Sequence, residues 1–431
     1  MDPVKITIDG KEVVTAKGKT VIQAADDVGI PIPRYCYHPK LSIAGNCRMC
    51  MVEIEKMPKL QISCNTQVAE GMSVLTQSPK VLAVRKAVLE FLLINHPVDC
   101  PICDQAGECW LQDYYMQHDR QSSRFDVGKV HDRKRTIFGP NVVFDGERCI
   151  KCTRCVRFCQ EITQTNELAV VNRGDHSTIA LFDNAVLDNP LSANVVDICP
   201  VGALTDREFR FKVRVWYLDK TPSICPGCST GCNISVEAYQ NRIARFKPRI
   251  NEAVNSHWLC DEGRYCFLDL AGGERLTTPM VRQEGGLVPA TWDQALQAIH
   301  AGLKSSSSLA AILSGRNTNE EAFLFAKLIK KLSADCALEV FYQERELSEV
   351  QKILVSPDRS PNFRGAREMG VASNGGFDAL AQKLLAGSFS SAFIVGEDLI
   401  ETAADPEAAR VALQKLSFLV VQETRVTETT K

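Results

Sequence analysis

The chain has 431 residues and a formal net charge of −2. A balance so close to neutral excludes the strongly basic surface of a nucleic-acid-binding protein, and the 18 cysteines are too sparse for a small disulfide scaffold. The length predicts about three domains of roughly 150 residues, or more if some are small cofactor-binding modules.

The N-terminal residues, Met1–Lys5, show no basic segment followed by an apolar one, so we expect no secretory signal. In the reducing compartment that this implies, clustered cysteines favour metal binding or catalysis over disulfides. The longest apolar run near the N-terminus, residues 88–94, is interrupted by Glu90 and is too short to span a bilayer. We therefore expect membrane association only through partner proteins.

Residues 1–78 predict a small β-rich domain. Apolar and polar residues alternate over residues 4–8, and Asp9-Gly10 is typical of a hairpin turn. The stretch Thr20–Gln23 has the form of a capping box and opens a short helix that Gly29 can end. Strand, turn, strand and helix are the beginning of a β-grasp ferredoxin domain.

Four cysteines in this domain predict a [2Fe-2S] cluster. The plant-type ferredoxin pattern has a shorter first gap of about four residues, so the longer gap here requires a longer loop but leaves the number of ligands unchanged. A zinc loop is the alternative, but it does not explain the β-grasp setting. The predicted ligands are Cys36, Cys47, Cys50 and Cys64.

Residues 79–119 predict a helical module with a mixed ligand set. Ser78 and Pro79 stand in the order of a helix cap and a first helical residue, and the helix should stop before Pro97. One imidazole and three thiolates predict a [4Fe-4S] cluster, in which the neutral ring changes the charge and hence the reduction potential. The alternative for the histidine is a helix-end residue that interacts with the dipole. The predicted ligands are His96, Cys100, Cys103 and Cys109.

Residues 140–215 predict a ferredoxin-like [4Fe-4S] domain, with a strand near residues 141–144 and strands and loops over 166–198. Three cysteines with two-residue gaps and a remote Cys-Pro are the ligand pattern of one cubane. Residues 188–198 contain no second triad, so Cys159 is expected to be spare. Zinc is the rival, because four thiolates also suit Zn²⁺. The predicted ligands are Cys149, Cys152, Cys155 and Cys199.

Residues 219–275 contain the last cysteine group. Its gaps of 2, 3 and 27 residues predict a [4Fe-4S] cluster, with zinc as the alternative, and Trp258 and Phe267 are expected to shield it from water. The cysteines outside all four groups are expected to be packing residues; they are Cys159, Cys266 and Cys336. The predicted ligands are Cys225, Cys228, Cys232 and Cys260.

Residues 276–431 predict a parallel α/β domain. A helix begins at Trp292, a buried strand covers 308–313 and a helix covers 319–332, and further buried strands start at Phe393 and Phe418. The chain contains neither a G-x-G-x-x-G nor a Walker A motif, so no dinucleotide or flavin site is expected. The predicted fold class is α+β multidomain.

The ordered series of all four groups, including CIKCTRC, CPVGAL and CPGCSTGC, resembles the large iron–sulfur subunit of respiratory complex I, the G subunit of bacterial NADH:quinone oxidoreductase. The resemblance covers essentially the whole chain. The tail resembles the molybdopterin-oxidoreductase fold through SGRNTNEEAF, PNFRGAREMG and VVQETRVTETTK. Three features depart from the family: Cys159 is extra, the tail stops at Lys431 where family members continue, and Cys336 stands in no molybdenum-binding motif.

The resemblance implies one [2Fe-2S] and three [4Fe-4S] clusters and no molybdopterin. It implies a protein that relays electrons from a flavin- and NADH-binding partner toward quinone-side iron–sulfur subunits, with no substrate site of its own. The expected location is peripheral, on the cytoplasmic face of the inner membrane.

The alternatives are the electron-input part of an NAD-dependent formate dehydrogenase or of a hydrogenase, and a zinc scaffold. The formate enzymes usually add a second ferredoxin triad, and a hydrogen-activating domain needs further cysteine motifs after Cys266; the sequence has neither.

Overall fold

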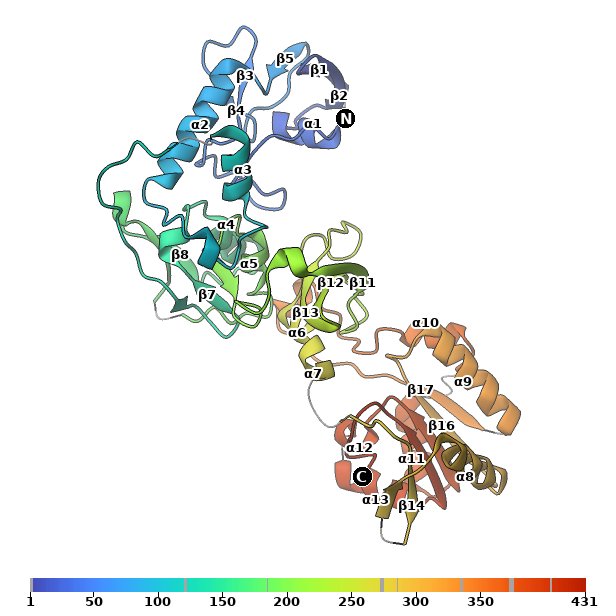
Figure 1. Cartoon of the computed structure of the whole chain (residues 1–431). Helices are drawn as coiled ribbons and strands as arrows, with labels where there is room; N and C mark the ends of the chain where they lie inside the picture. Colours follow the sequence, from blue (N-terminus) through green and yellow to red (C-terminus); the bar gives the residue numbers. More distant parts are fainter. Residues whose placement is uncertain are drawn as a thin grey trace. The chain divides into compact units, whose positions relative to one another are not determined.

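The computed structural model describes residues 3–119, 122–183, 185–271, 275–284, 286–333, 336–371, 376–403 and 405–431 (Figure 1). Met1 and Asp2, part of the segment expected to carry no signal, lie outside these ranges. The chain divides into two compact units. The first comprises Met1–Pro222, Ser235–Ile250 and Ser256–Asp261, and the second comprises Ser223–Ile234, Asn251–Asn255 and Glu262–Lys431. Over the described ranges, no helix combines the length and the apolar character needed to cross a membrane.

The first unit begins with a five-stranded sheet in the order β2-β1-β5-β3-β4. The predicted hairpin is confirmed, because β1 and β2 pair antiparallel around Asp9-Gly10, both of which have positive φ. The predicted capping box at Thr20 is also present, and the helix α1 that follows buries its apolar face in the core of this domain. The elements are β1 (Pro3–Ile8), β2 (Lys11–Ala16), α1 (Val21–Asp27), β3 (Met51–Ile54), β4 (Gln61–Ile62) and β5 (Met72–Leu75).

A capped helix, α2 (Pro79–Leu93), leads out of this sheet. The Ser78 hydroxyl accepts a hydrogen bond from the amide of Val81 at 3.4 Å, as a helix cap should. The helix ends before His96, which therefore stands in the loop that follows rather than in the last turn. The 3₁₀ turn η1 (Cys100–Ile102) and the helix α3 (Trp110–His118) complete this segment.

The ferredoxin-like region combines a small sheet, a hairpin and short helices. The strand predicted near residues 141–144 is confirmed as β7, in the sheet β10-β7-β6. The helix α5 was not predicted, since residues 166–198 were expected to be strands and loops. The elements are β6 (Thr136–Ile137), β7 (Val142–Phe144), η2 (Gly146–Arg148), α4 (Arg154–Arg157), the π-helix η3 (Phe158–Ile162), β8 (Leu168–Val171), η4 (Gly174–His176), β9 (Thr178–Leu181), α5 (Asn194–Ile198), β10 (Leu204–Asp206) and η5 (Val215–Tyr217).

A three-stranded sheet, β11-β12-β13, follows, and the boundary between the two units runs through β11 and β12. Its strands are β11 (Asp219–Ile224), β12 (Asn233–Tyr239) and β13 (Arg242–Pro248). Two short helices come next, α6 (Asp261–Tyr265) and α7 (Phe267–Ala271), and then the hairpin β14 (Met280–Gln283) and β15 (Gly286–Pro289).

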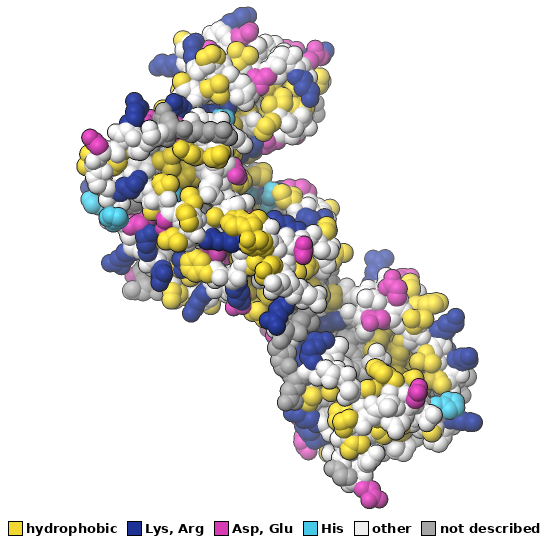
Figure 2. All heavy atoms as spheres, in the orientation of Figure 1, with side chains coloured by type: hydrophobic (Ala, Val, Ile, Leu, Met, Phe, Trp, Pro, Cys, Tyr) yellow, Lys and Arg dark blue, Asp and Glu magenta, His cyan; other side chains and the backbone are white. Residues whose placement is uncertain are grey.

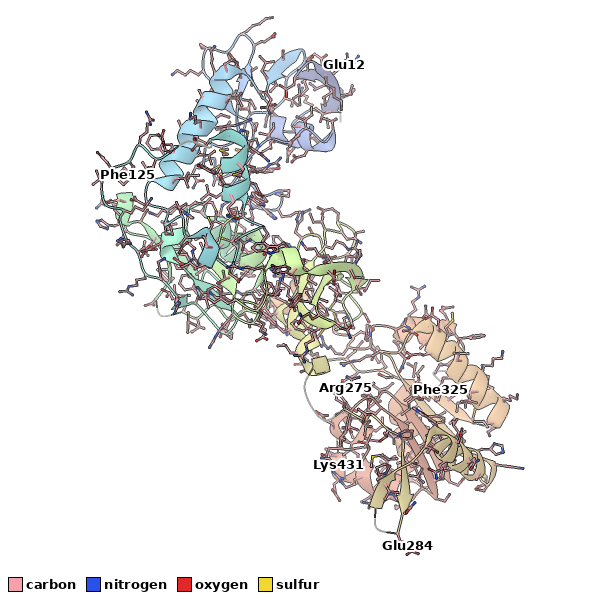
Figure 3. The ribbon with its side chains drawn as sticks, in the orientation of Figure 1. Glu12, Phe125, Arg275, Glu284, Phe325 and Lys431 are labelled. Atoms are coloured by element: carbon pink, nitrogen blue, oxygen red, sulfur yellow. The ribbon has the colours of Figure 1, made fainter. Side chains whose placement is uncertain are left out.

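The second unit is built on a four-stranded parallel sheet in the order β17-β16-β18-β19, which confirms the predicted parallel α/β domain. Apolar clusters lie on both faces, and Figure 3 labels Phe325 of α9, whose ring meets Phe393 of β18 edge to face at 5.4 Å between centroids. The strand β17 was not predicted. The remaining elements are α8 (Trp292–Lys304), β16 (Leu309–Ser314), α9 (Asn319–Leu332), β17 (Ala337–Phe341), η6 (Gln351–Ile353), α10 (Phe363–Glu368), α11 (Gly376–Leu385), β18 (Ser391–Val395), α12 (Leu399–Thr402), α13 (Pro406–Gln414) and β19 (Phe418–Gln422).

Acidic and basic side chains both occur over each unit on the face drawn in Figure 2. This mixture agrees with the near-neutral charge of the sequence.

Candidate iron–sulfur sites

The four cysteines of the first group converge as two thiol pairs. The Cys47 thiol donates to Cys36 and lowers the pKa of Cys36 to about 5, although burial acts in the opposite direction. The Cys64 thiol donates to Cys50 and likewise lowers the pKa of Cys50 to about 7. The charges of the two pairs also interact with each other. Two pairs of neighbouring thiolates match a [2Fe-2S] cluster, in which four thiolates are shared between two irons.

Backbone geometry shapes the loop that carries these thiols. The amides of Asn46 and Cys47 donate to the sulfur of Cys36. Arg48, between two predicted ligands, has a φ of 60°, in the left-handed region that non-glycine residues rarely adopt. Such conformations persist where surrounding contacts hold them, and they concentrate at functional sites.

The second group places a neutral histidine beside three cysteines in sequence. Burial lowers the pKa of His96 to about 4, so the ring is unprotonated at neutral pH, as a metal ligand must be. The amide of Val98 donates to Nδ1 of His96 at 3.2 Å, and Val98 itself has a φ of 53°. A β-branched residue in that region is a genuine outlier, which marks this turn as a constrained one.

The three thiols of the second group interact with one another and lie near the third group. Burial raises the pKa of Cys109 to about 12, and the charges of Cys103 and Cys199 contribute to the shift. Cys103 interacts in the same way with Cys100. The amide of Trp110 donates to the carbonyl of Pro200 at 3.0 Å, which ties the two ligand segments together.

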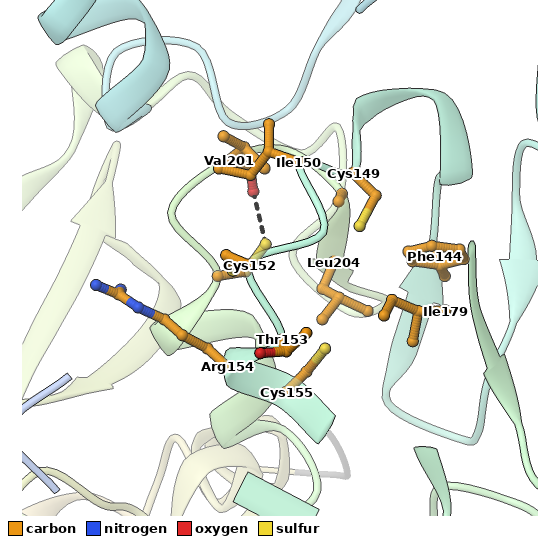
Figure 4. A pocket seen from close by; sticks show the side chains of 12 residues that line it. Phe144, Cys149, Ile150, Cys152, Thr153, Arg154, Cys155, Ile179, Val201 and Leu204 are labelled. Carbon is orange, nitrogen blue, oxygen red and sulfur yellow. Dashed lines mark hydrogen bonds between the residues drawn. The ribbon is translucent and has the colours of Figure 1, made fainter. Parts of the chain in front are cut away.

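The third group lines a small internal cavity, which contains all four predicted ligands in its wall. Figure 4 shows Cys149, Cys152 and Cys155 around this cavity, with apolar side chains such as Phe144 opposite them. The dashed line marks the thiol of Cys199, which donates to the carbonyl of Val201 at 3.1 Å. Burial first, and then the neighbouring thiols, raise the pKa values of the triad cysteines. A cluster that binds here must therefore stabilise their deprotonated form.

Cys159 lies outside the wall of that cavity. It stands in the π-helix η3, is fully buried and has its thiol hydrogen-bonded to Glu167. π-Helical turns occur frequently beside functional sites, and this one turns Cys159 toward a carboxylate instead of toward the triad.

The fourth group is divided between the two units, with Cys260 in the first unit and the other three cysteines in the second. All four are buried, with exposed fractions of 3–6%. The amide of Cys225 donates to the carbonyl of Cys232 at 2.8 Å, which closes their loop. Of the two predicted shielding residues, Trp258 belongs to the first unit and Phe267 to the second, and both are buried.

Sequence reasoning missed the role of Cys266. It was expected to be a packing residue, yet the thiol of Cys225 donates to it, and this contact raises the pKa of Cys225. The spacing gave no signal, because Cys266 follows the group by a gap that matches no ligand pattern.

A larger cleft, of about 1010 Å³, joins two of the groups within the first unit. Its wall includes His96 on one side and Cys149 on another, together with apolar residues of α2 and β9 and charged residues between them. Predicted ligands of the second and third groups therefore border one solvent-reachable space.

Five family models match consecutive parts of the chain. They are a 2Fe-2S iron–sulfur cluster binding domain (1–79), the NADH-ubiquinone oxidoreductase-G iron–sulfur binding region (85–124), the NADH-quinone oxidoreductase subunit 3 ferredoxin-like domain (139–205), the molybdopterin oxidoreductase Fe4S4 domain (218–269) and molybdopterin oxidoreductase (275–362).

Known proteins are similar over most of the chain. The G subunit of the NADH-quinone oxidoreductase of Rickettsia felis is 41% identical over 338 residues, which are 77% of this chain and 50% of the relative. The chain belongs to the G-subunit family of NADH-quinone oxidoreductases. In the same family, the NADH-ubiquinone oxidoreductase 75 kDa subunit of Reclinomonas americana is 42% identical over 77% of this chain and 48% of its own length. The mitochondrial 78 kDa subunit of Neurospora crassa is 48% identical over 69% and 40%.

The chain spans about half the length of the G-subunit relatives it matches. Among solved structures, a chain of an NAD⁺-reducing [NiFe]-hydrogenase is 31% identical, with a TM-score of 0.45, over 49% of this chain and 91% of its own length. A likeness at that TM-score supports no structural argument.

Each predicted ligand group falls within one of these iron–sulfur family models. The chain therefore contains 2Fe-2S and 4Fe-4S binding domains followed by a partial molybdopterin-oxidoreductase-like region, as the fold class predicted. The domain boundaries and the individual ligands remain predictions.

Buried cations near the ligand sets suit negatively charged clusters. Arg85 is fully buried, donates only a long 3.5 Å bond to the carbonyl of Met51, and has no partner for Nε or Nη1 within the part of the chain that the structure describes. Its charge interacts with the thiol of Cys50. A cluster bound by four thiolates supplies the negative charge that such a site lacks.

As placed, the described side chains form no group of three or more histidine, cysteine or acidic residues close enough to hold a single metal ion. The thiols of each group are thus more widely spaced than the ligands of one ion.

Proposed function

We propose that this chain is the iron–sulfur electron-transfer subunit of an NADH:quinone oxidoreductase. Electrons would enter from a flavin- and NADH-binding subunit and leave toward quinone-side iron–sulfur subunits of complex I. The chain itself would hold no substrate site and would make no chemical bonds. It would belong to an oxidoreductase and translocase complex and take its place on the cytoplasmic face of the inner membrane, attached through these partners.

The observation that carries this proposal is the proximity of three predicted ligand groups within one unit. The first and third groups share the hydrogen bonds of Arg157, whose guanidinium donates to carbonyls of Cys36 and Cys152. The third and second groups share the bond from Trp110 to Pro200. Cofactors held by these three groups would be neighbours, as electron transfer between them requires.

The ligand sets follow the groups described above. The first would hold a [2Fe-2S] cluster and the other three a [4Fe-4S] cluster each, with His96 as the one imidazole ligand. When bound, such clusters accept and release single electrons, and their potentials depend on net charge, hydrogen bonds to sulfur and burial. The protein's part is to place the thiolates, exclude water and supply charges and amides near sulfur.

No molybdopterin is proposed for the α/β region. Cys336 stands just before β17, only partly buried against the apolar core of that sheet. The region would serve as a structural platform.

The test is anaerobic purification of the full chain within its complex, followed by iron, acid-labile sulfide and zinc analysis and EPR. We expect roughly 14 iron atoms for each chain, two from one cluster and twelve from three. Stoichiometric zinc with little iron would establish the zinc scaffold instead. A full set of clusters in a complex that oxidises formate or hydrogen, and not one that reduces quinone with NADH, would establish the alternative redox roles.

A further inference from the structure

The short helix α4 carries two buried arginines, Arg154 and Arg157, with exposed fractions of 3% and 7%. Their hydrogen bonds go to backbone carbonyls and to one hydroxyl. Within the described ranges, neither guanidinium forms an ion pair with a carboxylate. A buried charge without a counter-charge is costly, so these two residues need another source of negative charge.

Arg157 joins a predicted ligand of the first group to one of the third. Its Nη2 donates to the carbonyl of Cys36 at 2.6 Å and to the carbonyl of Cys152 at 3.2 Å. Its Nε donates to the hydroxyl of Thr153 at 3.2 Å, and its Nη1 donates to the carbonyl of Ser42. The planar guanidinium is thereby held in one orientation, and a single side chain contacts both ligand loops.

Arg154 joins the same two loops one residue away from the ligands. Its Nη2 donates to the carbonyl of Tyr37, next to Cys36, and its Nη1 donates to the carbonyl of Ile198, next to Cys199, at 3.0 Å. The guanidinium lies over the ring of Trp110, 4.6 Å from its centre, which fixes its position further.

Two more contacts tie these loops together. The amide of Ser42 donates to Glu161 at 2.7 Å, and the side chain of Asn46 donates to the carbonyl of Lys151 at 3.2 Å. These contacts hold the loops but place no positive charge between the ligand sets. Only the two arginines combine position with charge.

We propose that Arg154 and Arg157 are positioning residues that bridge the predicted [2Fe-2S] and central [4Fe-4S] sites, fixing the separation of their ligand loops and raising the reduction potentials of both clusters. This inference rests on the proposed function, because the clusters supply the missing counter-charge. Reduction adds one negative charge to a cluster, and a nearby buried cation stabilises the reduced form more than the oxidised form. Arginine is suited to the role, because it stays charged when buried and presents several donors in a fixed plane.

The experiment is a potentiometric EPR titration of the anaerobically purified complex carrying Arg157→Gln or Arg157→Lys. Glutamine removes the charge, and we expect both midpoint potentials to shift to more negative values. Lysine keeps the charge without the fork, so we expect it to restore the potentials while the magnetic interaction between the two reduced clusters changes. The cluster of the second group is an internal reference, because the bonds of Arg157 described above do not involve its ligands.

Arg245→Gln is the matched control. Arg245 is also largely buried, but it forms ion pairs with Glu108 and Glu237 and contacts neither loop of the bridge. We expect this variant to leave both potentials unchanged even if the protein becomes less stable, which separates the bridge from the general cost of losing a buried arginine.

Unshifted potentials in Arg157→Gln with full EPR signals, or a shift confined to one cluster, would overturn the inference and leave the proposed function intact. If the parent complex contains no iron–sulfur clusters, the proposed function itself fails. If Arg157→Gln does not assemble, Arg157→Lys decides: unchanged potentials with an altered magnetic interaction support the bridge, and no change in either contradicts it.

Discussion

Gly202 lies against the sulfur of Cys103, so closely that a Cβ built on Gly202 would stand 2.3 Å from that Sγ. Real Cβ atoms do not approach another atom so closely. The loop that carries Cys199, a predicted ligand of the third group, therefore touches a predicted ligand of the second group through a residue that must have no side chain.

We predict that Gly202→Ala selectively disrupts the cluster of the second group, because the methyl group displaces Cys103. The EPR signal of that cluster should be lost and the iron content should fall by about four atoms. Gly128→Ala is the control, since a Cβ at Gly128 meets nothing within 4 Å. Normal iron content in Gly202→Ala would mean that Cys103 moves aside without losing its role or is not a ligand.

His96→Cys should keep the cluster of the second group and lower its midpoint potential. Burial keeps the pKa of His96 at about 4, so the native ring contributes no charge near neutral pH, whereas a thiolate adds a negative one. A potentiometric EPR titration measures the shift. His300→Cys, at an exposed position of α8, controls for the added thiol. The same potentials for every cluster would indicate that His96 is not a ligand.

Cys159→Ser and Cys199→Ser should differ sharply. Cys159 is bonded to Glu167 and stands outside the cavity of the third group, whereas Cys199 lines it. We expect all EPR signals to survive the first change and the signal of the central cubane to be lost or altered by the second. The reverse pattern would place Cys159 in the cluster.

Cys228→Ala should lower the thermal stability or assembly of the chain far more than the activity of each assembled complex. We propose that the fourth cluster is a relic of molybdenum enzymes that carries little electron traffic and acts chiefly as a structural staple, because metal binding contributes directly to folding. A melting curve and an NADH-to-quinone rate normalised to intact complex measure the two effects, with Cys336→Ala as control. A stable complex with almost no turnover would place this cluster on the main path.

Glu397→Gln should remove a pH dependence of stability from the parallel sheet. Burial raises the pKa of Glu397 to about 7 from its ordinary value of 4.5, although the hydroxyl of Ser314 donates to it at 3.0 Å. Below pH 4.5 both the folded and the unfolded states are protonated. Between pH 4.5 and 7 the unfolded state loses its proton first, so the free energy of unfolding falls by up to about 3 kcal/mol.

Glutamine cannot ionise, so the variant should gain stability relative to the parent as the pH rises from about 5 to about 7.5. Urea denaturation at several pH values, followed by hydrogen exchange in β16 and β18, measures this difference. Parallel stability curves for the two proteins would show that the carboxyl of Glu397 ionises normally in the fold.

Short-range chemistry made much of this protein predictable. The capping boxes, the Asp9-Gly10 turn and the helix over residues 319–332 follow from residues that contact their immediate neighbours in the chain. The ligand groups were found in the same way, since two-residue gaps bring thiols to one loop. These features survive any change in the rest of the fold, so the sequence by itself determined them.

The tertiary structure alone decided which loops meet. Arg157 and Cys36 are 121 positions apart, and no spacing rule connects them. The contact of Gly202 with Cys103 and the bond from Cys225 to Cys266 likewise depend on how separate segments pack. Packing is set by the burial of many side chains at once, so a contact between distant segments has no local signature, and the bridge between the first and third ligand groups becomes visible only when the chain has folded.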